Sequence, residues 1–149
     1  MTQGNRGIEQ VLTDLVARLQ RCRPVAVYLF GSHVAGTPRA DSDLDLAILL
    51  PPGAPAISGP ERLDLVGELE ALANRQVDLV VLNRAPLPLQ FEVIHTGRVL
   101  YEPDPEARTD WEDLVVRDYL DLQPWYAKSY RELLAEGKEG DGACSTDNS

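Results

Sequence analysis

Apolar residues recur along the first twenty positions at the spacing of one helix face, and short continuous apolar runs follow. The run at 25–30 comes after Pro24 and predicts a buried strand. The segment 43–50, which is apolar apart from two aspartates and which the Pro51-Pro52-Gly53 cluster ends, predicts a second strand. The recurring set predicts an amphipathic helix with one buried stripe, made of Ile8, Val11, Leu12, Leu15, Val16 and Leu19.

The later part of the chain alternates between helical and strand patterns. Gly59-Pro60 resembles an N-cap followed by proline in the first helical turn, and Gly97 is a typical helix end. Helix, strand, strand, helix, strand and further helices predict an α/β or α+β domain around a small sheet. The expected segments are a helix from 60 to about 73 with Leu65, Leu69 and Leu72 buried, a strand at 76–82, a helix at 87–96, an edge strand at 99–101, and a helix at 106–135 that Pro124 breaks or kinks.

The last predicted helix and the residues after it differ in composition. Trp111 and Tyr119 are expected to pack the last helix onto the sheet, whereas the aromatic residues from Trp125 onward are candidates for a docking surface. Residues 136–149 are rich in Gly, Ser and Asp and predict a disordered tail. The domain is therefore expected to span residues 1–135.

Length and charge narrow the class of protein. The 149 residues suffice for one domain. The sequence contains no run of about 18 apolar residues, the length that would predict a membrane span. The polar N-terminus does not resemble a signal peptide, so we expect a cytoplasmic protein. The net charge of −10 argues against free nucleic acid as the main partner and favours a basic protein surface or a nucleotide carried in with metal ions.

Two short motifs flank the turn between the first two strands. Gly31 permits a sharp turn and close approach of a phosphate, and Ser32 offers a hydroxyl and a free amide to an anionic oxygen. Asp43 and Asp45 are two apart on the expected second strand, which places both carboxylates on one face. Hard oxygen ligands at this spacing can share one or two Mg²⁺ ions. The motifs therefore predict a metal-dependent nucleotidyl-transfer site.

Asp78 is a candidate third carboxylate. It lies among apolar residues of the third expected strand, where burying an unpaired acid is unfavourable. We expect it to bind a second metal ion or to act as the base for an incoming hydroxyl. The alternative is an acid that simply faces solvent.

These residues also carry a resemblance to a known family. Phe30-Gly31-Ser32, Gly36, Arg39 and 42–46 resemble the signature of the polymerase-β-type nucleotidyltransferase superfamily. Within it, the short length and the segments 91–93, 96–101 and 117–122 resemble the minimal nucleotidyltransferase antitoxins. The resemblance covers residues 8–135.

The resemblance implies a small mixed sheet flanked by helices, and a site that binds ATP with Mg²⁺. It also implies a hetero-oligomer with a HEPN ribonuclease toxin, which is silenced when AMP is transferred to a tyrosine hydroxyl. Many members have arginine where this chain has Ala35, so Arg39 is expected to contact the triphosphate beside Gly31 and Ser32.

Two other functions stay open at this point. One is a small-molecule nucleotidyltransferase of the aminoglycoside type, although little chain follows the third strand to build a drug pocket. The other is an antitoxin that acts by binding and occlusion alone, since an acidic protein can cover a basic ribonuclease.

Overall fold

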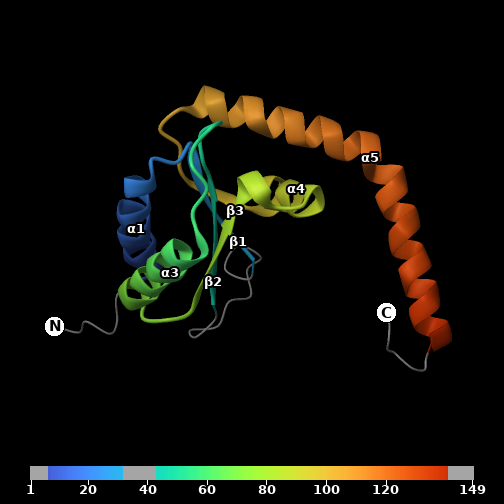
Figure 1. Ribbon diagram of the computed structural model, residues 1–149, viewed down its shortest axis with the longest axis horizontal. Coiled ribbons are helices and arrows are strands. Elements are labelled where there is room, and N and C mark those ends of the chain that lie inside the picture. The colour runs from blue at the N-terminus through green and yellow to red at the C-terminus, as the bar shows by residue number, and fades with distance from the viewer. Residues whose placement is uncertain (1–6, 32–42, 141–149) are drawn as a thin grey trace.

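A four-stranded mixed sheet forms the centre of the protein (Figure 1). The computed structural model describes residues 7–31 and 43–140, with 126–140 described by their backbone alone. The strand order is β3-β2-β1-β4, in which β1 is antiparallel to both of its neighbours and β2 is parallel to β3. The strands are β1 (Ala26–Phe30), β2 (Leu44–Leu49), β3 (Val77–Val81) and β4 (Arg98–Tyr101). The small mixed sheet flanked by helices is thereby confirmed.

Helices cover both faces of the sheet. On one face α1 (Ile8–Leu19) and α3 (Gly59–Ala73) pack side by side, and on the other lie α4 (Leu87–Thr96) and the first part of α5 (Pro105–Gly140) (Figure 1). Two short 3-10 helices, η2 (Gln20–Cys22) and η3 (Leu82–Arg84), extend α1 and β3. The predicted helices at 8–19 and 87–96 are confirmed at these positions.

The burial of β2 reflects this two-sided covering. Leu44, Leu46 and Ile48 point to the α1–α3 side, because alternate residues of a strand share a face. Ala47 and Leu49 are also buried, on the α4 side. A strand that is covered on both faces needs apolar residues at almost every position, which explains the continuous apolar run in the sequence.

The N-terminus of α3 differs by one residue from its expected position. Ser58, and not Gly59, is the N-cap, and it forms a capping box with Glu61. The buried stripe is Leu65, Leu69 and Ala73, whereas Leu72 is 36% exposed, so its predicted burial was wrong. The three buried residues are each four positions apart along one helix face. Leu72 directly precedes Ala73 and therefore lies at the side of that face.

α5 is a single helix with Pro124 inside it. Figure 1 shows that it bends sharply, and a proline within a helix both removes a hydrogen bond and clashes with the preceding turn. The helix runs to Gly140, so residues 136–140 are helical and not the start of a tail as expected. The rest of the expected tail, 141–149, lies outside the described residues.

A polar network joins α5 to the sheet. The hydroxyl of Tyr28, a buried residue of β1, donates a hydrogen bond of 2.7 Å to Glu112. Arg108 forms ion pairs of 2.7 Å with both Glu112 and Glu102. Trp111 packs against the same side of the sheet, as predicted, whereas Tyr119 stacks on Phe91 of α4 and not on the sheet. Within residues 7–31 and 43–140, no helix is both long and apolar enough to cross a membrane.

Candidate active site

Gly31 directly follows β1 and lies against the side chain of Asp45. Its φ of 84° falls in the left-handed region that side chains rarely adopt, so the sharp turn expected here is present. A Cβ at Gly31 would lie only 2.2 Å from Oδ2 of Asp45. The close approach therefore involves a carboxylate of the neighbouring strand, in addition to any phosphate that the sequence led us to expect.

Asp45 lies in the middle of a row across the sheet. It is paired in register with Phe30 of β1 and with Asp78 of β3. Paired residues of neighbouring strands point to the same face, about 5 Å apart. The row is at the carboxyl end of β1 and the amino ends of β2 and β3, on the face that α4 covers farther along. The fold therefore brings the carboxylates of Asp45 and Asp78 together from separate strands.

Asp43 lies just outside the sheet. β2 begins at Leu44, whose amide donates a 3.0 Å hydrogen bond to the carbonyl of Gln76. Asp43 is exposed at the entry to the strand, whereas Asp45 is partly buried within it. The expectation that both aspartates lie on the second strand was therefore wrong for Asp43, because backbone pairing with the third strand region starts one residue later.

Asp78 is exposed and has a basic neighbour. Its side chain is 62% exposed, so the argument that burial makes this acid unfavourable does not apply. Arg62 of α3 donates a hydrogen bond to the carbonyl of Leu79 and lies 3.8 Å from Oδ1 of Asp78. Since β3 is an edge strand, Arg62 pairs with backbone that would otherwise face solvent.

Arg62 is the residue of this site that the sequence analysis missed. It lies sixteen positions before Asp78 on a helix, and its acidic and apolar neighbours along the chain give it no distinguishing pattern. Only the packing of α3 beside the sheet reveals the contact. Ser32 and Arg39, both expected to bind phosphates, lie outside the described residues, as does Ala35.

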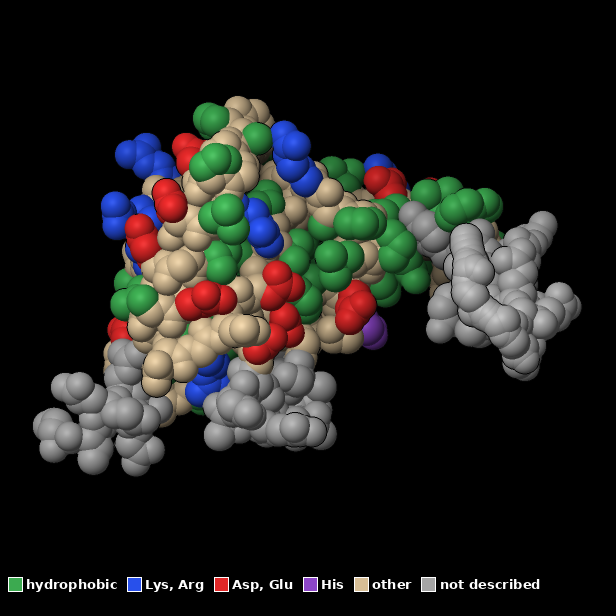
Figure 2. Space-filling view, turned by 60° about the horizontal axis from the view of Figure 1, so that its bottom comes forward, with side chains coloured by type: hydrophobic (Ala, Val, Ile, Leu, Met, Phe, Trp, Pro, Cys, Tyr) green, Lys and Arg blue, Asp and Glu red, His purple; other side chains and the backbone are tan. Residues whose placement is uncertain are grey.

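The carboxylates suit a hard divalent ion that arrives with its substrate. In the described part of the chain, no three His, Cys, Asp or Glu side chains are grouped closely enough to hold a metal ion by themselves. Mg²⁺ is typically held by one or two carboxylates together with substrate phosphates and water. The exposed Asp43 and Asp78 and the partly buried Asp45 offer such oxygens. Figure 2, turned so that the bottom of Figure 1 comes forward, shows acidic side chains close together on this face.

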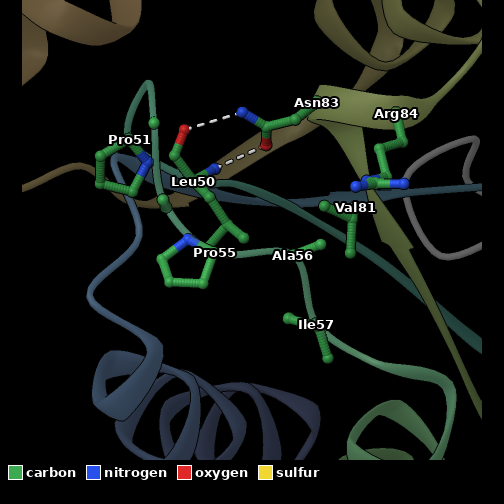
Figure 3. A pocket seen from close by; sticks show the side chains of 10 residues that line it. Leu50, Pro51, Pro55, Ala56, Ile57, Val81, Asn83 and Arg84 are labelled. Atoms are coloured by element: carbon green, nitrogen blue, oxygen red, sulfur yellow. Dashed lines mark hydrogen bonds between the residues drawn. The ribbon is translucent and has the colours of Figure 1, made fainter.

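The pocket in Figure 3 lies elsewhere. It has a volume of about 390 Å³ and is lined by 50–51 and 53–57 together with Val81, Asn83 and Arg84. These segments follow the carboxyl ends of β2 and β3, whereas Asp45 and Asp78 lie near the amino ends of the same strands. Asn83 exchanges two hydrogen bonds with the backbone of Leu50, of 2.8 and 2.9 Å (Figure 3). Its polar groups are thus used in holding the loop.

Comparison with known proteins supports a nucleotidyltransferase. The chain is 33% identical over 94 residues to the protein adenylyltransferase MntA of Shewanella oneidensis. That alignment spans 63% of this chain and 62% of the relative's length.

Solved structures share the fold over a larger part of the chain. A crystal structure of a toxin–antitoxin with AMP-PNP is 25% identical, has a TM-score of 0.71, and is matched over 83% of this chain and 98% of its own. A second match is a chain from the complex of a tri-AMPylated Shewanella oneidensis HEPN toxin with an MNT antitoxin. It is 21% identical with a TM-score of 0.68, and the match covers 85% of this chain and 98% of the matched chain, which shows the fold.

Residues 14–106 match the sequence profile of the family described as polymerase beta, nucleotidyltransferase. This span is well over half of the chain and contains Gly31, Asp43, Asp45 and Asp78. The chain therefore belongs to the polymerase beta nucleotidyltransferase family.

Proposed function

We propose that this protein is an antitoxin that transfers AMP from ATP to a tyrosine hydroxyl of a HEPN ribonuclease toxin and thereby neutralises it. The observation that carries the proposal is the contact of Gly31 with Asp45, in register with Asp78. This arrangement places oxygen ligands beside the turn at Gly31, which Ser32 follows in the sequence. Family membership and the likeness to MntA support the same reaction.

In the proposed reaction, the tyrosine oxygen forms a bond to the α-phosphorus of ATP. The bond from that phosphorus to the bridging oxygen breaks, and pyrophosphate leaves with the electron pair. Asp78 accepts the phenolic proton, because an exposed carboxylate at the sheet edge can be reached by a hydroxyl of another protein. The products are the AMP ester of tyrosine and pyrophosphate, so atoms and charge balance.

The other residues hold the nucleotide in place. Ser32 and Arg39 bind the triphosphate, and Asp43 and Asp45, with Asp78, would hold Mg²⁺. When bound, the metal ion supplies charge neutralisation at the phosphate oxygens. The contact of Gly31 with Asp45 fixes where that carboxylate lies relative to the turn. Catalysis by this chain is thus positioning and electrostatic stabilisation.

The partner is proposed from two kinds of observation. The chain has 24 acidic and 14 basic residues, which suits a basic protein surface, and a ribonuclease needs basic residues to bind RNA phosphates. A structural relative of 25% identity is a toxin–antitoxin crystallised with AMP-PNP. We therefore expect a hetero-oligomer with the toxin encoded in the adjacent reading frame.

The test uses the purified protein, Mg²⁺, α-labelled ATP and the toxin from the adjacent reading frame. Label is expected on the toxin, and it is expected to be lost in Asp43→Asn/Asp45→Asn. Asp64→Asn, on the exposed side of α3, is the matched control and is expected to label normally.

Label that persists in Asp43→Asn/Asp45→Asn would overturn the proposed site. Ribonuclease inhibition without label, by the wild type and the variant alike, would favour occlusion over AMP transfer. Label on a soluble aminoglycoside but not on the toxin would identify a small-molecule nucleotidyltransferase instead.

A further inference from the structure

Exposed hydrophobic side chains are concentrated on α5. Of the six large hydrophobic side chains that are exposed among the described residues, four belong to this helix and two to α3. Figure 1 shows that α5 extends past the sheet and past α4, then bends and continues away from both. The four on α5 are Leu114, Leu120, Leu122 and Trp125.

Two of them lie on a stripe separate from the packing face. Leu114, Asp118, Asp121 and Trp125 are spaced at i, i+4, i+7 and i+11, which is the spacing of one helix face. We call these four residues the α5 stripe. Leu114 is 49% and Trp125 is 61% exposed, and they lie about 16 Å apart along the helix. The residues that pack on the rest of the protein are instead Trp111, Val115 and Tyr119.

The charge around the α5 stripe is strongly negative. Residues 105–125 contain six acidic and two basic residues, and Asp118 and Asp121 lie within the stripe itself. Figure 2 shows lysine and arginine side chains mainly on the other half of the molecule, whereas hydrophobic side chains dominate the half with α4 and α5. A stripe of two apolar and two acidic side chains fits a partner that presents apolar residues among lysine and arginine.

We infer that the α5 stripe is the surface on which the basic HEPN toxin docks, which rests on the proposed function for the identity of the partner. A ribonuclease must carry lysine and arginine near the RNA it cleaves, so the acidic side chains of the stripe match its surface. Trp125 and Leu114 supply the apolar contacts, since tryptophan in particular contributes much of the energy of protein interfaces. The stripe binds the acceptor protein, whereas Asp43, Asp45 and Asp78 act on the tyrosine.

The experiment measures the dissociation constant of the full chain with its toxin by calorimetry. Two variants change the α5 stripe separately, Leu114→Ser/Trp125→Ala for its apolar part and Asp118→Lys/Asp121→Lys for its charge. The matched control is Leu63→Ser/Asp64→Lys on α3, where one exposed leucine and one exposed acid are changed in the same way. Binding of ATP and the circular dichroism spectrum report whether each variant is folded.

Each stripe variant is expected to raise the dissociation constant at least tenfold, and the control is expected to leave it within about twofold of the wild type. Only the charge variant should lose its effect at high salt. The inference is overturned if both stripe variants bind like the wild type, if the control weakens binding equally, or if the wild type does not bind the toxin.

Failure of the proposed function looks different. In that case the wild type binds the toxin but no label is transferred, and the stripe variants still weaken binding. If AMP transfer is correct and only the docking surface is wrong, the stripe variants bind and label the toxin like the wild type.

Discussion

Gly31 is the residue on which the geometry of the site depends most directly. Its backbone conformation is unfavourable for residues with a side chain, and Oδ2 of Asp45 occupies the place of its missing Cβ. A side chain there would displace the carboxylate, the backbone, or both. The glycine therefore positions Asp45, even though it supplies no functional group of its own.

Gly31→Ala is expected to lower AMP transfer to the toxin by about 100-fold, because a displacement of about 1 Å at a reacting centre has effects of that size. Rates of label transfer at saturating ATP measure the effect. Gly67→Ala, in α3, is the control, since a Cβ there meets nothing within 4 Å. A wild-type rate in Gly31→Ala would show that the position of Asp45 does not matter.

Arg62 is expected to position Asp78. Arg62→Gln removes the guanidinium that contacts both Leu79 and Asp78, and we expect kcat for AMP transfer to fall by about tenfold while KM for ATP changes little. Arg62→Lys should recover only part of kcat, because lysine lacks the planar fork that can reach two acceptors. If Arg62→Gln and Arg62→Lys lose the same amount of kcat and the same amount of thermal stability, the role of Arg62 is purely structural.

A polar network attaches α5 to the sheet beside the packing of Trp111 and Val115. Tyr28, Glu112 and Arg108 join β1 to the first turns of this helix across 84 positions of sequence. Because α5 carries the α5 stripe, this network and the apolar packing together set where the stripe lies relative to Asp45. The long helix is therefore held at its beginning, while its later part extends away from the sheet (Figure 1).

Tyr28→Phe is expected to lower the free energy of unfolding by about 1.5–3 kcal/mol, the usual range for a hydrogen bond to a charged group. Chemical denaturation at pH 7 measures it. The control is Tyr101→Phe, at a partly buried position of β4, which keeps the ring and removes a hydroxyl. Val27→Ala is unsuitable as a control because it creates a cavity. Equal stability of Tyr28→Phe and the wild type would contradict a role for the network.

The same tyrosine gives an expectation for alkaline pH. Burial, the hydrogen bond to Glu112 and the negative charge of that residue raise the pKa of Tyr28 far above its usual value of 10.0. A raised folded-state pKa stabilises the protein fully below pH 10, and this stabilisation is lost as the pH rises above it, because only the unfolded chain then releases the proton. Tyr28→Phe should therefore lose less stability above pH 10 than the wild type does.

The charge of the whole molecule is expected to govern its association with the toxin. With a net charge of −10, attraction to a basic partner contributes to affinity and is screened by salt. The dissociation constant should rise by about tenfold between 50 and 500 mM NaCl, measured by calorimetry. Leu114→Ser/Trp125→Ala should weaken binding at every salt concentration without changing this dependence. Affinity that is independent of salt would contradict an electrostatic contribution.

Local patterns were sufficient for most of the elements. The helices at 8–19 and 87–96 and the core strands lie where periodicity and turn residues predicted them, because these signals reflect short-range geometry. Leu72 and Asp43 were misplaced for a different reason. Burial at the edge of a helix and the first paired residue of a strand depend on which neighbours pack there, and a single sequence does not specify those neighbours.

By itself, the sequence determined the order of the elements, the family signature at Gly31, Asp43 and Asp45, and the acidic character of the chain. Tertiary structure alone decided that Asp45 lies against Gly31 and beside Asp78, that Arg62 reaches the same edge, and that Glu112 bonds to Tyr28. The physical reason is that motif and periodicity are encoded by nearby residues, whereas these contacts join strands and helices that are distant in sequence. Their geometry follows from the packing of helices on both faces of the sheet.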